Sequence, residues 1–168
     1  MYKINDYVVY KRDVCIVKDI KDNYRNNEGY YILYPIDDDS LKIEVPISNK
    51  QGFLRNLITY DEAIDLINCI PKIETISCND KLLEAEYKNL LNSLNHKDLI
   101  KIIKTSYTKN KERIDNKKKI ISRDEKYFKL AEKYLYNELS IVLNKTIEET
   151  KEFIQKKAYD FDTYVVKE

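Results

Sequence analysis

In residues 1–58 apolar and polar side chains alternate with a period of two, and polar turn residues separate the apolar runs. The runs are rich in Val, Ile and Tyr, which favour extended backbone. They predict strands over 6–11, 14–20, 30–36 and 41–46, with loops over 22–29 and 37–40. Four or five short strands with no helix between them predict a small antiparallel β-barrel of the SH3 or Tudor type.

After Gly52 the period of the apolar positions changes from two to 3.6, which indicates helices. Thr59 and Glu62 have the spacing of a capping box and predict a short helix that Pro71 ends. Further helices are expected from Leu83 to Leu94 and from Asn95 or His96 through Tyr107. The polar segment 109–119 is either a bridge or an extension of the second of these helices.

The strongest helical pattern runs from Ser122 to Leu143. Ser122 and Glu125 have capping-box spacing, and an apolar stripe follows at steps of three and four residues. Thr146 and Glu149 predict one more helix. The chain is therefore expected to be α+β, a β-barrel followed by a bundle of about four helices.

This pattern divides the chain into four parts. We expect a barrel domain over 1–58, a short helix and connection over 59–79, a helical domain over 80–158, and a tail over 159–168. The tail has no capping residue and little apolar content, so it is expected to be frayed or docked.

Charge is distributed unevenly between the two halves of the chain. Residues 1–79 contain 10 basic and 13 acidic side chains, whereas residues 80–168 contain 20 basic and 16 acidic ones. Between Lys81 and Lys133 the excess reaches +7, from 15 basic and 8 acidic residues. Such a surface attracts polyanions. A solvated helical surface is the alternative interpretation.

Several classes of site are not indicated by the sequence. Cys15, Cys69 and Cys78 lack paired spacing and are expected to be reduced and mostly packed. His96 is the only histidine and is expected to be exposed at a helix start, so no histidine-based catalytic set can be assembled. The run Asp37-Asp38-Asp39 favours a solvated turn over a metal site. No enzyme activity, metal or other cofactor is expected.

The sequence also contains no long apolar run and no leader-like N-terminus. These features predict a protein that resides in the cytoplasm without a membrane partner.

Several segments together resemble the CarD family of bacterial transcription regulators. They are DYVVY, the Glu44-Val45-Pro46 run, Leu54-Arg55, Tyr87-Lys88 followed by Leu91, Leu94 and Asp98, then Ser122-x-x-Glu125-Lys126 and Glu138-Leu139. The resemblance covers roughly Met1 to Lys157. It implies a Tudor-like N-terminal domain that binds the β subunit of RNA polymerase. It also implies a helical domain that contacts promoter DNA at the upstream edge of the bubble and stabilises the open complex.

The resemblance carries DNA contacts over to individual positions. Lys88 and Lys126 match basic residues of the family, and Arg123 lies beside Lys126. Leu83 stands where the family has a tryptophan wedge, and this chain has no tryptophan. Leucine can insert into the minor groove as an apolar wedge. An ordinary core residue is the alternative for Leu83.

The polymerase contact is expected at the fourth strand, through Ile43, Glu44 and Val45. Glu44 replaces a basic residue of the family, but main-chain strand addition does not depend on side-chain charge. We expect a monomer, with dimerisation through the same strand as the alternative.

Two other classes of function remain open at this stage. One is an adaptor that binds polymerase without contacting DNA, and the other is a small nuclease or transferase.

Overall fold

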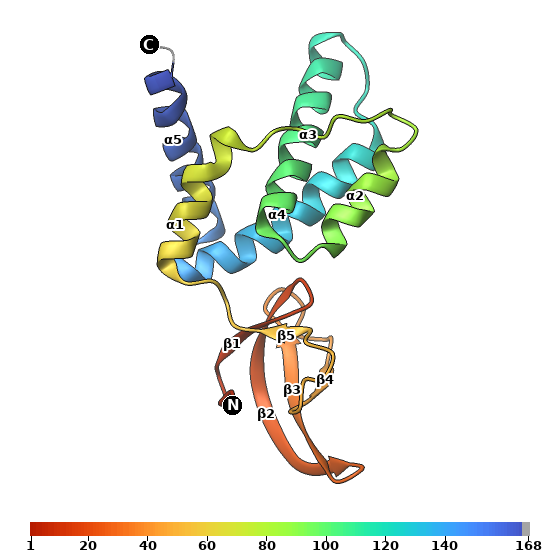
Figure 1. Ribbon diagram of the computed structural model, residues 1–168, viewed down its shortest axis with the longest axis vertical. Helices are drawn as coiled ribbons and strands as arrows, with labels where there is room; N and C mark the ends of the chain where they lie inside the picture. The colour runs from red at the N-terminus through yellow and green to blue at the C-terminus, as the bar shows by residue number, and fades with distance from the viewer. Residues whose placement is uncertain (166–168) are drawn as a thin grey trace. The chain divides into compact units, whose positions relative to one another are not determined.

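The computed structural model describes residues 1–165, and the side chains of residues 1–157. The chain divides into two compact units, Met1–Ile58 and Thr59–Glu168, and each is described here by itself. The first unit is a sheet and the second is helical (Figure 1). The protein is therefore α+β, as the sequence predicts.

Five antiparallel strands form the first unit, in the order β4-β3-β2-β1-β5. Their bounds are β1 Tyr7–Tyr10, β2 Asp13–Arg25, β3 Glu28–Pro35, β4 Ile43–Pro46 and β5 Leu54–Arg55. Strands β4 and β5 are the two ends of this order, so the sheet is open. The predicted small antiparallel strands are present, but they do not close into the predicted barrel. Short edge strands of four and two residues leave too few main-chain groups to close the sheet.

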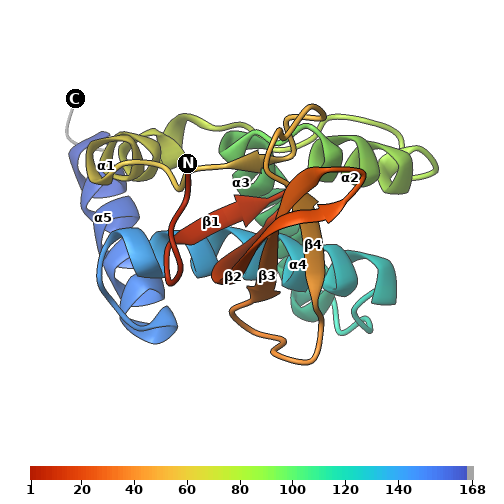
Figure 2. The same cartoon turned by 90° about the horizontal axis from the view of Figure 1, so that it is seen from below.

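The expected loop over 22–29 is in fact the end of a long hairpin. Strand β2 continues to Arg25, which pairs with Glu28 at the start of β3. Asn26 and Asn27 have φ values of 51° and 56°, the left-handed backbone of a two-residue hairpin turn that asparagine tolerates. The hairpin projects beyond the rest of the sheet (Figure 1). A register shift between Val17 and Asp19 interrupts the β2–β3 ladder, where a bulge increases the twist visible in Figure 2.

Alternation along the strands buries one set of side chains in a core. Val8, Val17, Leu33 and Val45 are each less than 5% exposed, and Ile43 packs against them. Cys15 belongs to the same core, whereas Cys69 is half-buried and Cys78 is exposed. The expectation of mostly packed thiols therefore fails for Cys78.

This difference predicts the order in which the thiols react. Burial raises the pKa of Cys15 to about 12, so its reactive thiolate is scarce near neutral pH. Cys78 is expected to react with a thiol reagent in the native protein within minutes, and Cys15 only after unfolding. Labelling of single-cysteine variants with and without denaturant measures this. Fast native labelling of Cys15 would contradict the packing of the first unit.

The described residues of the second unit, 59–165, form five helices and one 3₁₀ turn. They are α1 Tyr60–Cys69, η1 Ile70–Lys72, α2 Leu83–Asn92, α3 His96–Asp115, α4 Ser122–Val142 and α5 Ile147–Val165. Helix α4 packs against both α3 and α5, and α1 lies beside α5 (Figure 1). The segment 109–119 is thus mainly an extension of α3. Most of the predicted tail is helical, because α5 runs to Val165; residues 166–168 lie outside the described chain.

The helix caps confirm two sequence predictions and correct a third. Thr59 and Glu62 form a reciprocal capping box at α1, and Thr146 with Glu149 does the same at α5. At α4 the N-cap is Ile121, without a side-chain hydrogen bond. Ser122 is already helical, so the predicted Ser122–Glu125 box does not form.

The centre of the apolar stripe of α4 is buried as its spacing predicts, whereas Phe128 and Val142 at its two ends are only half-buried. Ala131, Leu135 and Leu139 are at most 2% exposed. Tyr127 and the acidic residues Asp124 and Glu138 are also buried on this helix. Buried carboxylates need partners, and these partners organise the polar groups of the helical unit.

Candidate functional site

The outer edge of β4 presents unpaired main-chain groups. In an antiparallel ladder, hydrogen-bonded and non-hydrogen-bonded pairs alternate. Ile47 N donates to Gly29 O at 2.9 Å, so the pairs Tyr31–Val45 and Leu33–Ile43 are the bonded ones. The Ile32–Glu44 pair lies between them and is not bonded. The N–H and C=O of Glu44 therefore point away from β3, towards the open edge.

The three predicted polymerase-contact residues have different environments. Val45 is 4% exposed, and Ile43 is half-buried and packs against the same core, so both side chains face the core. The Glu44 side chain lies on the other face. Only Glu44 thus offers both its main chain and its side chain to a partner.

The Glu44 carboxylate is held by two neighbours from the hairpin and by one residue just before β4. Lys42 Nζ lies 2.7 Å away, Arg25 2.9 Å away, and the Tyr24 hydroxyl donates at 3.3 Å. The hydrogen bond from Lys42 is the main cause that lowers the pKa of Glu44. Two cations and one carboxylate leave this cluster with a formal charge of +1. The charge reversal noted in the sequence is therefore offset locally by Lys42, two residues away in the sequence, and by Arg25, which the hairpin brings near.

A pocket of about 360 Å³ adjoins this edge. Val45 and Pro46 line it from β4, together with Tyr10 of β1 and Phe53, the residue before β5. The two rings meet edge to face, with centroids 6.5 Å apart. Polar side chains, among them Glu28 and Gln51, line the pocket as well as these apolar ones. A pocket of this mixed lining beside an unpaired strand can accept a side chain of an added strand.

In the helical unit, the structure contradicts the interpretation of Leu83 as a wedge. Leu83 is the first residue of α2 and is 1% exposed, so it cannot insert into a groove without unpacking the core. The alternative, an ordinary core residue, is correct. The neighbouring Leu82 is 62% exposed and is the apolar side chain at this surface.

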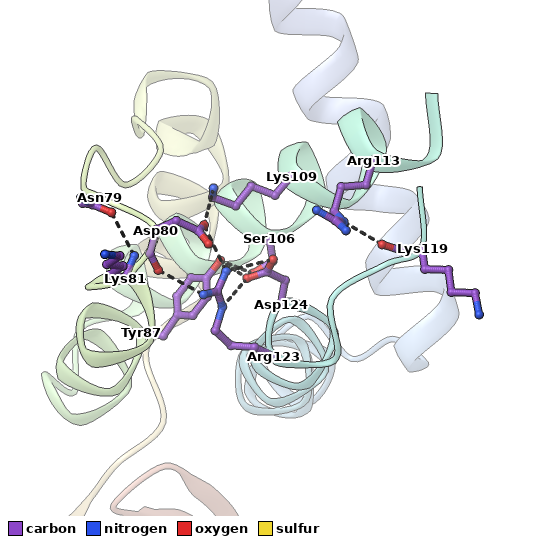
Figure 3. Close-up of polar contacts among 10 residues, drawn as sticks. All are labelled: Asn79, Asp80, Lys81, Tyr87, Ser106, Lys109, Arg113, Lys119, Arg123 and Asp124. Carbon is purple, nitrogen blue, oxygen red and sulfur yellow. Dashed lines mark hydrogen bonds and ion pairs between the residues drawn. The ribbon is translucent and has the colours of Figure 1, made fainter. Parts of the chain in front are cut away.

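Arg123 also has a different position from the one expected. Its guanidinium lies 3.0 Å from Asp124 Oδ1 and 3.2 Å from Asp80 Oδ1, and its side chain is 19% exposed (Figure 3). The hydrogen bond to Asp124 is the main cause that raises the pKa of Arg123. Arg123 is therefore an internal partner rather than a free phosphate ligand.

Asp124 is the centre of this network. It is fully buried and accepts from both Nε and a terminal nitrogen of Arg123. The Tyr87 hydroxyl donates to it at 3.3 Å and accepts from Ser106 at 3.2 Å. Burial raises the pKa of Tyr87 to about 12, so the phenol stays protonated as a donor. The network joins α2, α3 and α4 (Figure 3).

Lys88 and Lys126 are exposed, as a phosphate contact requires. Lys126 Nζ lies 5.5 Å from the centre of the Tyr127 ring. Lys88 lies 3.5 Å from Glu84, whose carboxylate also accepts from the Tyr127 hydroxyl. Lys126 thus lies near the Tyr127 ring, and Lys88 is linked to the Tyr127 hydroxyl through Glu84.

Sequence reasoning missed a second buried pair. His96 Nε2 lies 2.8 Å from Glu138 Oε2, with side chains 16% and 3% exposed. The expectation of an exposed histidine is wrong, because α4 places Glu138 opposite the start of α3. His96 and Glu138 are 42 residues apart, and a repeat within one helix cannot indicate a contact over that separation.

Other kinds of site are not found in the described part of the chain. No three His, Cys, Asp or Glu side chains there gather as a metal site. In the Asp37–Asp39 run, Asp38 accepts hydrogen bonds from the main chain and hydroxyl of Ser40, as in a solvated turn. Within the same residues, no helix has the length and apolar character to cross a bilayer.

Comparison of the sequence with protein-family models and with curated proteins gave no match. The case for a function therefore depends on the residues and geometry described above.

Proposed function

We propose that this protein is a non-catalytic transcription regulator of the CarD type that acts in the cytoplasm without a cofactor. Its first unit binds the β subunit of RNA polymerase by adding a polymerase strand to β4. Its helical unit contacts promoter DNA near the upstream edge of the bubble and modulates the stability of the open complex. The observation that supports this best is the outward main chain of Glu44 on an edge strand.

The finer fold assignment is part of the proposal. Strand β2 is long and pairs with both β1 and β3. The bulge at Val17–Asp19 bends it, so that its two ends can belong to two differently oriented halves of the sheet. The order β4-β3-β2-β1-β5 is compatible with an SH3- or Tudor-like arrangement whose edges do not pair. We therefore assign the first unit to that class.

The DNA contact is expected to be weak and independent of sequence. Lys88 and Lys126 are exposed, and ammonium groups bind phosphate oxygens without reading bases. Attachment to polymerase raises the effective concentration of the helical unit at the promoter, so a weak contact is enough. Leu83 and Arg123 are removed from this proposal, because both side chains are engaged inside the helical unit.

The test compares two substitutions at Glu44. Glu44→Pro removes the outward N–H but leaves the bonds to β3, whereas Glu44→Gln keeps the main chain and removes the charge. We expect Glu44→Pro to weaken binding to a polymerase β-subunit fragment about tenfold, and Glu44→Gln to change it less than threefold. Biolayer interferometry with the full chain measures both, and circular dichroism checks the fold.

Equal binding by wild type and Glu44→Pro would contradict strand addition, and no binding by wild type would contradict the polymerase partner. Size-exclusion chromatography tests whether the chain instead forms a dimer through this edge. A wild-type dimer that Glu44→Pro converts to monomer would show that the edge pairs with a second copy of the chain.

An adaptor without DNA contact is the second candidate. The internal positions of Leu83 and Arg123 favour it, because they reduce the number of available DNA contacts. It predicts full polymerase binding and no measurable affinity for a promoter duplex.

A further inference from the structure

The turn between α3 and α4 has a concentration of basic residues that the family resemblance did not draw on. Residues 109–119 contain six basic and two acidic side chains. Three of the basic residues are consecutive, Lys117, Lys118 and Lys119, and we call them the lysine turn. Helix α3 ends at Asp115 and α4 begins at Ser122, so the lysine turn lies between the helix ends.

Main-chain bonds hold the lysine turn in a defined shape. Lys118 N donates to Arg113 O at 2.7 Å, and Lys117 N donates to Ile114 O at 2.9 Å. Arg113 Nε donates to Lys119 O at 2.7 Å, which ties the end of the turn back to α3 (Figure 3). Lys117 has a φ of 55°, a left-handed conformation in which glycine or asparagine is usual at a helix end. Local backbone preference therefore does not explain a lysine at this position.

The ammonium groups of the lysine turn face solvent. All three side chains are exposed, and no carboxylate of the described residues forms an ion pair with them. By contrast, Lys109 and Arg123 nearby are both paired with Asp80. Figure 3 shows the Lys119 side chain pointing away from that network. Three adjacent unneutralised cations on a fixed turn suit a partner with closely spaced negative charges, and duplex DNA is such a partner.

Exposed apolar side chains lie next to the lysine turn. Ile114 is 57% exposed and Ile120 is 42% exposed, one on each side of it in the sequence. Tyr107, 58% exposed, precedes Ile114 by seven residues and so shares its face of α3. An amphipathic membrane helix needs a continuous apolar face, which three side chains do not supply. Isolated apolar side chains among cations match the sugar and base contacts of a nucleic acid groove better.

We propose that the lysine turn is a DNA-backbone contact of the helical unit, with Ile114 beside it against the groove. The inference rests on the proposed function and deepens it, because it names the surface that meets DNA. This contact adds to the proposed contacts of Lys88 and Lys126. It takes the place of contacts by Leu83 and Arg123, whose side chains are engaged inside the helical unit.

The experiment measures binding of the full chain to a labelled duplex of about 30 base pairs by fluorescence anisotropy, over about 50 to 200 mM salt. The test variant is Lys117→Gln, Lys118→Gln, Lys119→Gln. The control variant is Lys97→Gln, Lys145→Gln, Lys156→Gln, which changes the net charge equally at exposed positions outside the turn. We expect the test variant to bind about 10- to 100-fold more weakly, with a salt slope smaller by about 2 to 3. The control variant is expected to stay within about threefold of wild type.

Four results would overturn the inference. Equal losses in the two variants would show an effect of net charge alone. Full affinity with a lowered melting temperature in the test variant would mean that the lysines only neutralise the C-terminal end of α3. Binding of wild type to anionic lipid vesicles but not to DNA would identify a membrane surface. Absence of any DNA binding by wild type would refute both this inference and the DNA part of the proposed function. If wild type binds DNA and the test variant binds it equally well, only the role of the lysine turn is refuted.

Discussion

Replacement of Asp124 by alanine is expected to lower the free energy of unfolding of the helical unit by about 3 to 5 kcal/mol. Asp124 is fully buried and is the acceptor for two nitrogens of Arg123 and for the Tyr87 hydroxyl. Its removal leaves a guanidinium that is 19% exposed with Asp80 as its remaining carboxylate partner in the structure. Urea unfolding of the full chain, monitored by the helical circular dichroism signal, measures this loss of unfolding free energy.

Glu125→Ala is the matched control for Asp124→Ala. Glu125 lies in the same first turn of α4, but its side chain is 50% exposed and pairs with Lys129 at 2.8 Å. Both variants lose one acidic residue near the helix N-terminus, so the dipole contribution is common to the two. We expect Glu125→Ala to cost less than about 1 kcal/mol.

Two further variants keep the prediction testable if Asp124→Ala does not fold. Asp124→Asn retains the volume and is expected to cost about 2 kcal/mol, because the amide still accepts one hydrogen bond. The double variant Arg123→Met, Asp124→Leu is expected to be more stable than Asp124→Ala, because no buried charge is left unpaired. Similar stabilities of Asp124→Ala and Glu125→Ala would contradict a central role for this network.

Leu83→Ala is expected to lower the free energy of unfolding by about 2 to 4 kcal/mol, whereas Leu82→Ala changes it by less than about 0.5 kcal/mol. The two leucines are adjacent, but Leu83 is 1% exposed and Leu82 is 62% exposed. Truncating Leu83 leaves a cavity beneath α2, and truncating Leu82 removes atoms that already contact water. Urea unfolding of both variants measures the difference.

This pair of variants also separates a core role from a wedge role. An exposed wedge at Leu83 would lose DNA contact without losing stability when it is truncated. A cost below about 1 kcal/mol for Leu83→Ala, with weaker DNA binding, would therefore contradict the packing of α2 and restore the interpretation that the resemblance implied.

The proposed contacts can be combined into one physical scheme. The β4 edge supplies a main-chain interaction, which tolerates changes in side chains. The charge of Glu44 on this strand is neutralised by Lys42 and Arg25, so it does not oppose that interaction. The lysine turn, Lys88 and Lys126 supply charge that tolerates any DNA sequence. Neither interaction needs to be strong alone, since each raises the local concentration for the other.

Local sequence patterns were sufficient to predict much of the secondary structure. The Thr59–Glu62 and Thr146–Glu149 capping boxes were predicted correctly because both partners lie within one turn of helix. The α4 stripe was predicted because three-residue and four-residue steps define one helix face. The change from period two to period 3.6 likewise predicted strands before helices. Each of these signals depends only on residues close together in the chain.

Which side chains remain available for binding depends on tertiary packing. Leu83 and Leu82 differ by one position in an apolar pair, and only the packing of α2 shows which of them is buried. Besides the adjacent Asp124, Arg123 pairs with Asp80, 43 residues away, and His96 pairs with Glu138, 42 residues away. Such pairings leave no periodic signal, because they depend on how helices cross rather than on how one helix repeats. Local patterns along the chain therefore predict most of the helices and strands and the overall charge. The fold sets which charges are neutralised internally and which, such as those of the lysine turn, face solvent.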